Sequence, residues 1–407
     1  MIETLVIPWF HDRHSHVSLY GALQGCPDLG GLEPEAALAL LRELPRDRVS
    51  TVTGWRSSRL AFTAEQLETL PPAILLNFSL HGFALTGGAR RLLRPEQLEL
   101  LAHQSDPAWC ERNMERLLAF FGQAAGLTEA KLGSFMAGLE RAGIGAVEDM
   151  LLTDEAALRV IQASPWSALI RCWTTPAIYR TLGADAQAAV AGLKVFTDGA
   201  LGARTAAMEG TFLGGGAGLL IHSEAALTQE LRTLQPFGKP VAVHAIGARA
   251  VGQALAALET LAAEHRTFPL VRLEHVQFIT LAQARRAKAL GVVLSMQPNF
   301  NSDSVDYSDR LGQADLEANN PFRMLLDEAG FRCGEDLIFG SDGMPHGMEY
   351  ALQWSLFPPF PGQRLSVAEL SAGYGAAPGA KGQATLGVDA AERTVRLLRS
   401  EEIKPIS

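Results

Sequence analysis

The sequence predicts an α/β fold, a (β/α)8 TIM barrel, from its alternating pattern and its length. Short apolar runs rich in β-formers alternate with longer segments of Ala, Leu, Glu and Arg, which is typical of parallel strands joined by helices. A chain of 407 residues is long enough to form such a barrel. Eight runs fit the strands: Thr4–Phe10, Ala146–Met150, Ala168–Trp173, Leu193–Thr197, Val241–His244, Val271–His275, Val292–Met296 and Leu337–Gly340.

Helices are predicted between most of these runs. Apolar residues recur at helical spacing in Glu224–Leu234, Ala250–Ala263 and Leu281–Ala289. After the last run, a Gly/Ala-rich stretch precedes a predicted terminal helix over Asp389–Leu398.

The connection from the first run to the second is too long for an ordinary βα loop. More than 120 residues separate them, and two further strand-like runs, Val49–Gly54 and Ala73–Phe78, lie inside the gap. We interpret residues 17–125 as an insertion over the barrel mouth, with residues 1–16 and 126–407 as the barrel. The alternative is that one of the two inserted runs is itself a barrel strand.

Composition narrows the class of partner. The net charge is −9 and the pI about 5.6, which argues against nucleic acid and anionic membranes. The four cysteines lie far apart and form no CxxC pair, so neither a disulfide framework nor a cysteine zinc site is predicted. The start of the sequence does not resemble a signal peptide, and no apolar run is long enough to span a membrane. We expect a cytoplasmic protein that acts on a small molecule, with self-association left open.

Metal-ligand residue types occur at the ends of the predicted strands, where barrel enzymes hold their chemistry. His14 and His16 follow the first run, His244 and His275 end the fifth and sixth, and Asp342 follows the eighth. Side chains at i and i+2 of a strand point the same way, so the two histidines of the HxH pair can bind one ion. Histidine and carboxylate are expected ligands of Zn²⁺. An isolated HxH pair would more often be coincidental.

Lys194 is the sharpest single feature. If Leu193 and Val195 face the helices, Lys194 and Asp198 face the barrel interior. A buried lysine tends to lose its proton, and a neutral amine can react with CO₂ to give a carbamate, an anionic oxygen ligand. The alternative is a lysine paired with Asp198 or Glu274.

Together these residues resemble the amidohydrolase superfamily: HxH on the first strand, Lys on the fourth, His on the fifth and sixth, and Asp on the eighth. The segments FHDRHSH, LKVFTDGALGARTAAM, VAVHAIGARAV with RLEHVQF, SMQPNF and FGSDGMP resemble the branch of N-substituted formamide deformylase. The resemblance implies a metal-dependent hydrolase. In it His14, His16 and Asp342 hold one divalent ion, His244 and His275 a second, and carboxylated Lys194 bridges them. The LNFSLHGFALTGGA stretch resembles one in which that branch holds a histidine, here His81.

Two departures from the family pattern bear on the expectation. The HxH pair comes early and the tail lacks recognisable closing strands, so we expect the companion β-sandwich to be reduced or absent. Asn299 stands where relatives often have histidine after the QP segment, which puts the substrate class in question.

The mechanism that follows is a hypothesis. Metal-activated water attacks an amide-type C–N bond, and Asp342 takes up the proton and passes it to the leaving nitrogen. His81 and Arg204 are candidate substrate-binding residues, although Arg204 could equally form a structural ion pair. Asp12 and Asp198 are candidates for orienting the ligands. Rival functions are an esterase, lactonase or phosphotriesterase on the same site, and a non-catalytic metal-binding barrel.

Overall fold

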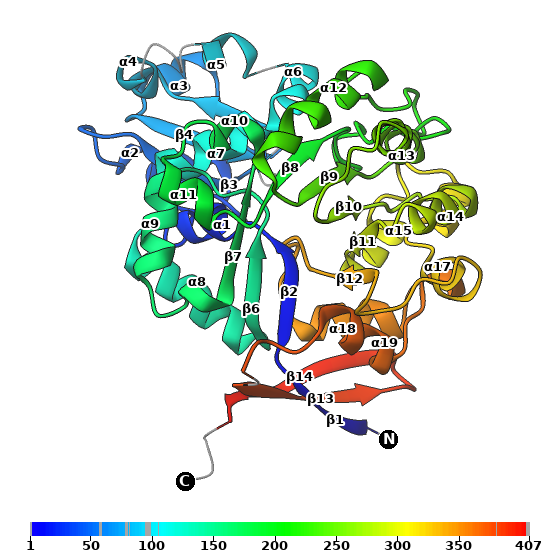
Figure 1. Cartoon of the computed structure of the whole chain (residues 1–407). Coiled ribbons are helices and arrows are strands. Elements are labelled where there is room, and N and C mark those ends of the chain that lie inside the picture. The colour runs from blue at the N-terminus through cyan, green and yellow to red at the C-terminus, as the bar shows by residue number, and fades with distance from the viewer. Residues whose placement is uncertain are drawn as a thin grey trace.

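The centre of the molecule is an eight-stranded parallel sheet rolled into a barrel (Figure 1). The computed structural model describes residues 2–56, 59–77, 80, 82–93, 99–104, 106–379 and 381–403. The sheet order is β12-β11-β10-β9-β8-β7-β6-β2, which confirms the predicted α/β barrel. Its strands are β2 (Phe10–Ser15), β6 (Ile144–Asp149), β7 (Ile170–Thr174), β8 (Gly192–Phe196), β9 (Val241–Ala245), β10 (Val271–His275), β11 (Val293–Met296) and β12 (Leu337–Phe339).

The two end strands of this sheet meet through the residues that follow β12. The Asp342 amide donates to the His14 carbonyl at 2.7 Å, and the Ser341 amide donates to the Asp12 carboxylate at 2.9 Å. At Gly340 a Cβ atom would lie 2.3 Å from the His14 nitrogen, so only glycine allows this approach. The closure brings the first and last strand ends together.

Helices surround the barrel in the alternation that the sequence predicts. The helix predicted over Glu224–Leu234 and the one over Leu281–Ala289 are confirmed with the same bounds, and the third begins two residues earlier than predicted, at Ala248. The helices after the insertion are α8 (Glu129–Arg141), α9 (Glu155–Ala163), α10 (Pro176–Tyr179), α11 (Ala184–Ala189), α12 (Glu224–Leu234), α13 (Ala248–Ala263), α14 (Leu281–Ala289), α15 (Asp303–Asp306), α16 (Gln313–Ala318), α17 (Phe322–Asp327), α18 (Met348–Leu356) and α19 (Val367–Tyr374).

The predicted first barrel strand, Thr4–Phe10, is wrong in position. Residues Ile2–Pro8 form β1, which pairs antiparallel with the tail strand β13 (Gly382–Asp389), and the barrel strand β2 starts only at Phe10. The apolar run Thr4–Phe10 begins in the sheet of β1 and ends in the barrel sheet. Hydrophobicity alone does not show to which of two sheets a strand residue belongs. The count of eight strands holds because β2 replaces the predicted run.

The predicted terminal helix is also wrong. Residues Thr394–Glu402 form the strand β14, which pairs antiparallel with β13. The turn between them is set by the Asp389 carboxylate, which accepts from the amides of Ala391 and Glu392, and by Arg393 with φ 53°. Tertiary pairing here overrides helix-forming composition. The companion sheet is thus present but reduced to three strands, β1-β13-β14, beside both termini in Figure 1.

The segment between β2 and α8 adds further helices and strands, most of which lie at the upper left of Figure 1. Its three-stranded sheet, β3-β4-β5, does not join the barrel, so the alternative that one of these runs is a barrel strand is wrong. The first four residues of β4 are apolar because both faces of the strand are buried there: Ile74 and Leu76 pack in one core and Leu75 in another. Its elements are α1 (Val17–Ala22), α2 (Pro34–Arg42), β3 (Ser50–Trp55), α3 (Ala64–Thr69), β4 (Ala73–Asn77), β5 (Phe83–Leu85), α4 (Gly87–Leu92), α5 (Glu99–His103), α6 (Pro107–Arg112) and α7 (Met114–Ala125).

The structure also bears on the expectations about disulfides and membrane-spanning helices. All four cysteines are free thiols, which confirms that no disulfide framework is present. Within the described ranges, no helix has the length and apolar character that crossing a bilayer requires.

Candidate active site

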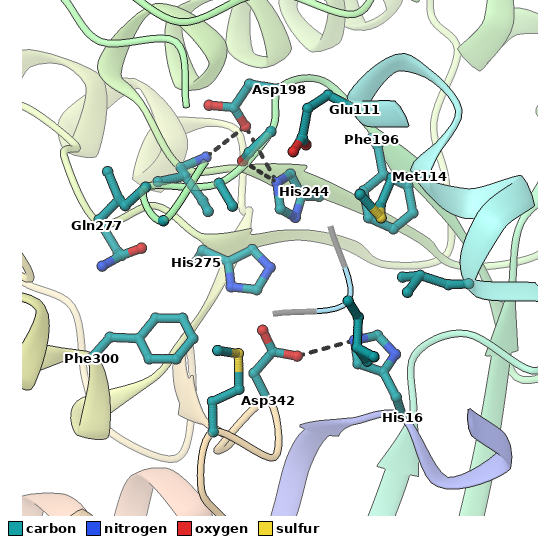
Figure 2. A pocket seen from close by; sticks show the side chains of 18 of the residues that line it. His16, Glu111, Met114, Phe196, Asp198, His244, His275, Gln277, Phe300 and Asp342 are labelled. Atoms are coloured by element: carbon teal, nitrogen blue, oxygen red, sulfur yellow. Dashed lines mark hydrogen bonds and ion pairs between the residues drawn. The ribbon is translucent and has the colours of Figure 1, made fainter. Parts of the chain in front are cut away.

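A cavity open to solvent lies at the carboxyl ends of the barrel strands (Figure 2). Its floor contains His16, Lys194, His244, His275 and Asp342. The segment between β2 and α8 supplies part of the wall, and α7 contributes two apolar side chains to it. The lining residues from this segment are Leu19, Tyr20, Leu80, Glu111, Met114 and Leu118. The inserted unit therefore shapes the cavity, while its exact bounds, 17–125, stay a prediction.

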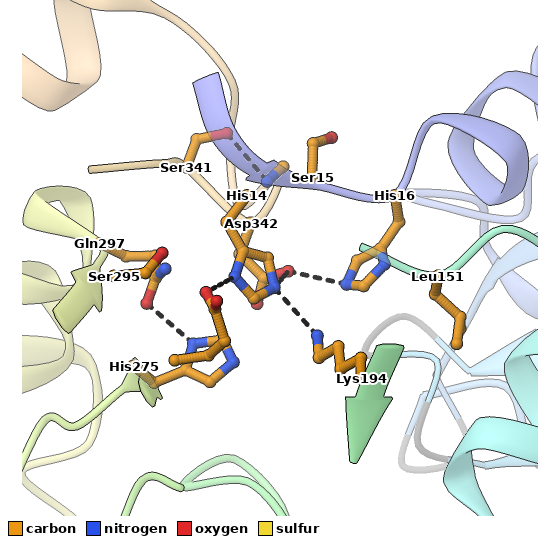
Figure 3. A network of polar contacts seen from close by, with 12 residues as sticks. His14, Ser15, His16, Leu151, Lys194, His275, Ser295, Gln297, Ser341 and Asp342 are labelled. Atoms are coloured by element: carbon orange, nitrogen blue, oxygen red, sulfur yellow. Dashed lines mark hydrogen bonds and ion pairs between the residues drawn. The ribbon is translucent and has the colours of Figure 1, made fainter. Parts of the chain in front are cut away.

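The HxH pair and Asp342 converge on one point. The Nε2 atom of His16 lies 3.0 Å from Asp342 Oδ1, and the Nε2 atom of His14 lies 3.7 Å from the same oxygen. The i, i+2 spacing at the end of β2 makes this possible: His14 lies in the strand and His16 directly follows it, so both rings can leave the chain on one side. Figure 3 shows the two rings and Asp342 facing one another.

Two of the rings are oriented by partners that come from other strands or strand ends. His14 Nδ1 lies 2.6 Å from Glu274 Oε2, and His275 Nδ1 lies 2.8 Å from Gln297 Oε1. Because an ionised carboxylate and an amide oxygen only accept hydrogen bonds, each Nδ1 carries the proton. Each Nε2 therefore carries the ring's lone pair. This tautomer, with the proton on Nδ1 held by a partner, is the one found in histidines that bind a metal through Nε2.

His244 presents the opposite ring nitrogen. Its Nε2 atom lies 3.1 Å from the Gly199 carbonyl and 3.4 Å from Asp198 Oδ1, so the proton is on Nε2 and Nδ1 is the free nitrogen. The His244 and His275 ring centroids are 4.6 Å apart. The fifth and sixth strands thus bring two imidazole rings close together.

Lys194 lies in the barrel interior, as the strand parity predicts. Only 1% of its surface is exposed, whereas Leu193 and Val195 pack in the outer core. Its Nζ atom lies 3.0 Å from His14 Nε2, and neither Asp198 nor Glu274 comes within the 4.0 Å of an ion pair. Burial lowers the pKa of Lys194 to about 8, so a sizeable fraction of the amine is neutral near physiological pH.

The backbone is strained where two of these side chains leave their strands. His275 has φ 71° and Asp342 has φ 58°, a left-handed region that non-glycine residues rarely adopt. Such strain persists only where the surroundings hold it, and it concentrates at functional sites. Burial favours the neutral acid at Asp342, but the hydrogen bond from His16 and the neighbouring imidazoles hold its pKa well below the usual range.

The donor set fits a divalent cation. Among the described residues, ligand atoms of His14, His275 and Asp342 lie within 4.8 Å of one another. Burial lowers the pKa of His14 to about 4 and that of His275 well below its usual value, which keeps both rings in the neutral form that metals require. The buried Nδ1 of His16 has no hydrogen-bond partner in the described part of the chain. Neutral imidazoles, a carboxylate and a partly neutral amine suit Zn²⁺ or a similar ion.

The remaining predicted residues fall into different places. Asp12 accepts from the backbone amide of His14 and from Ser341, so it holds two strand ends rather than an imidazole. Asp198 lines the cavity and accepts from the amides of Ala207, Ile246 and Gly247. It braces the loops beside His244.

Arg204 and His81 gain no support as substrate-binding residues. The Arg204 side chain is 42% exposed, lies 4.0 Å from Asp309 and is not among the residues that line the cavity. This is the structural ion pair that the sequence left open. His81 lies outside the described residues.

Beneath the cavity lies a buried ionic network that sequence reasoning noticed only at Glu274. Arg272, 2% exposed, donates to Glu148 at 2.8 Å and lies 2.7 Å from Glu274. Its charge, together with His14, overcomes burial and lowers the pKa of Glu274. The sequence signal for this network was the presence of charged residues inside apolar strand runs. No sequence signal indicated the contact of His346 with Ser15 at 2.7 Å.

Comparison with known proteins agrees with this geometry. A model of the amidohydrolase family matches residues 3–350. An amidohydrolase-named protein of Bacillus subtilis (strain 168), YtcJ, is 31% identical over 144 residues, which are 35% of this chain and 27% of that protein. The chain thus covers only about a quarter of that relative's length.

Solved structures of similar shape share the fold. An uncharacterized metal-dependent hydrolase from Pyrococcus furiosus has a TM-score of 0.65 and 21% identity, covering 91% of this chain and 81% of that one. One from Pyrococcus horikoshii OT3 has a TM-score of 0.64 and 22% identity, covering 87% and 74%. Since the family model matches most of the chain, and the histidines, lysine and aspartate lie together at the strand ends, the protein belongs to the amidohydrolase family.

Proposed function

We propose that the protein is a metal-dependent hydrolase that cleaves an amide-type C–N bond in a small molecule. The observation that carries the proposal is the convergence of imidazole nitrogens from His14, His16 and His275 on Asp342, next to the buried Lys194 amine. Family membership gives the coarse assignment, and the chemistry of the donor set supports it.

The ligand assignment is the one that the family resemblance implies. His14 and His16 with Asp342 would hold one ion, and His244 and His275 a second. We infer zinc, because neutral imidazoles dominate the set. Lys194 would bridge the two as a carbamate, formed when the neutral amine adds to CO₂ and releases one proton.

A divalent ion in this cavity would supply Lewis acidity, lowering the pKa of water and polarising a carbonyl oxygen. Asp342 then serves as the proton shuttle: its carboxylate, kept ionised by its neighbours, accepts a proton from the nucleophile and delivers it to the leaving nitrogen. The apolar wall formed by Leu19, Met114 and Leu118 limits competing water.

The test is turnover by the zinc-loaded protein on a matched panel of amides, esters, lactones and phosphotriesters. We expect cleavage of amides, its loss on chelation and its return with Zn²⁺. Cleavage of esters, lactones or phosphotriesters without any amide would favour the rival substrate class. No turnover on the whole panel, in protein that still binds zinc, would favour a non-catalytic barrel.

A further inference from the structure

One acidic side chain in the cavity wall has no role in the metal-ligand cluster. Asp303, the first residue of α15, lines the cavity next to Phe300, Gln277 and Tyr307. One carboxylate oxygen, Oδ2, accepts from Gln277 Nε2 at 2.9 Å. The other, Oδ1, accepts no hydrogen bond within the described part of the chain. Asp303 therefore keeps an acceptor available.

This carboxylate is held in place rather than free to swing away. Gln277 is 1% exposed, follows the strand end of β10 and donates a second hydrogen bond to Asn319 at 3.0 Å. Asn319 is in turn fixed by donating to the Phe300 carbonyl and to Ser304. An acceptor fixed in this way can recognise a ligand at low entropic cost.

Nearby cations do not neutralise Asp303. The guanidinium of Arg310 is engaged by Asp309 and by the Gly202 carbonyl, and it stacks on the Tyr307 ring at 4.6 Å. It makes no ion pair with Asp303 within 4.0 Å. Burial, together with the Asp306 charge, raises the pKa of Asp303 to about 7, although the Gln277 hydrogen bond and the Arg310 charge oppose the rise.

The rest of the described wall is apolar, uncharged polar or acidic. Away from the metal-ligand cluster, and apart from Asp198 with its three backbone amides, its charged residues are Glu111 and Asp303, and no lysine or arginine lies among them. Its apolar residues include Leu201, Ile246 and Met344. A ligand carboxylate would meet repulsion here, whereas a protonated amine would find an acceptor.

We propose that Asp303 is a specificity-determining residue that accepts a hydrogen bond from a protonated amine on the substrate. The preferred substrates are then amides whose apolar body carries a cationic group away from the scissile bond. This inference rests on the proposed function, because it names the substrate class of the same cavity.

The test is a calorimetric titration of the zinc-loaded protein with three uncleavable probes. These are 4-arylbutan-2-ones, in which a methylene replaces the amide N–H. The para substituent is dimethylaminomethyl (cationic), isobutyl (its neutral isostere) or carboxymethyl (anionic). We expect the cationic probe to bind about tenfold or more tightly than the isobutyl probe, and the anionic probe to bind most weakly.

Two variants separate the role of Asp303 from a general effect of charge. Asp303→Asn keeps an acceptor for Gln277 and should bring the cationic and neutral probes to equal affinity, with binding of the isobutyl probe unchanged. Asp306→Asn removes an exposed charge from the same helix, outside the cavity lining, and should keep the preference.

The inference is overturned if the wild-type protein binds the cationic probe no better than its isostere. The same holds if the anionic probe binds best, or if Asp303→Asn retains the full preference. Because the probes cannot be cleaved, these outcomes are independent of the turnover panel, whose failure would instead overturn the proposed function.

Discussion

Asp342 joins structural and chemical roles in one residue. Its backbone amide closes the barrel against His14, its left-handed φ of 58° turns the chain, and its carboxylate faces two histidines. We expect Asp342→Asn to lower kcat/KM by at least about a hundredfold, since it removes the proton acceptor. Circular dichroism should show an unchanged fold, because asparagine also tolerates this backbone region. Full activity of the variant on a verified substrate would disprove the shuttle.

Glu274 acts on the site through His14. Its carboxylate fixes the His14 proton on Nδ1 and is balanced by Arg272. We expect Glu274→Gln to weaken zinc affinity by about tenfold to a hundredfold, because the ring loses a charged partner that raises its basicity. Competition with a chromophoric chelator measures this without turnover. Zinc affinity equal to that of the wild type would show that Glu274 only neutralises Arg272.

At the scale of elements, the closure of β12 against β2 depends on a single glycine. A methyl group at position 340 would meet backbone and side-chain atoms of His14 at 2.3–2.8 Å. We expect Gly340→Ala to destabilise the protein by about 2 kcal/mol or more and to weaken zinc binding, because the strand ends that carry His14 and Asp342 move apart. Gly210→Ala, where a Cβ meets no atom within 4 Å, is the matched control. Equal denaturant midpoints for the two variants would contradict the closure argument.

Glu115 of α7 is a buried carboxyl group whose ionisation is unfavourable in the folded protein. Burial, together with Glu230, raises the pKa of Glu115 from 4.5 to about 7, while Arg180 opposes the rise. The folded state therefore binds the proton more tightly than the unfolded state, and stability falls as pH rises from about 4.5 to about 7.

We expect Glu115→Gln to leave stability nearly unchanged at pH 4.5 and to raise it by about 1 to 3 kcal/mol at pH 8. Urea unfolding at both pH values measures the difference. Exposed Glu209→Gln should show no such dependence. The stability gain of Glu115→Gln over the wild type should be larger at pH 8 than at pH 4.5. Equal gains at the two pH values would show that ionised Glu115 does not destabilise the folded state.

At the scale of the whole molecule, the sequence predicted the repeating strand–helix units of the barrel. It did not predict the pairing of strands that lie far apart in the chain. Strand ends of a barrel must meet at one face, so residue type and strand position were enough to bring Lys194, His244 and His275 together. The strands of the reduced end sheet were predicted wrongly because Ile2–Pro8 pairs with Gly382–Asp389, at the opposite end of the chain. No local sequence pattern indicates that pairing.

The residues that form the wall of the cavity could not be predicted from the sequence either. Asp303 and Glu111 come from segments that are close only after folding, and Arg204, chosen for its charge, points to Asp309 instead. The sequence therefore predicted the reaction class of the site better than its substrate preference. This is expected when the ligand set lies on regular strands and the wall on loops and an inserted unit.

The central claim is that six side chains at the strand ends bind divalent ions. Diffraction at the zinc absorption edge, from crystals grown with Zn²⁺ and bicarbonate, tests it most directly. We predict one anomalous peak about 2.1 Å from the nitrogens of His14 and His16, beside Asp342, and a second between His244 and His275. Extra density on the Lys194 amine should link them. Crystals with zinc elsewhere, or with no peak within bonding distance of these residues, would contradict the account.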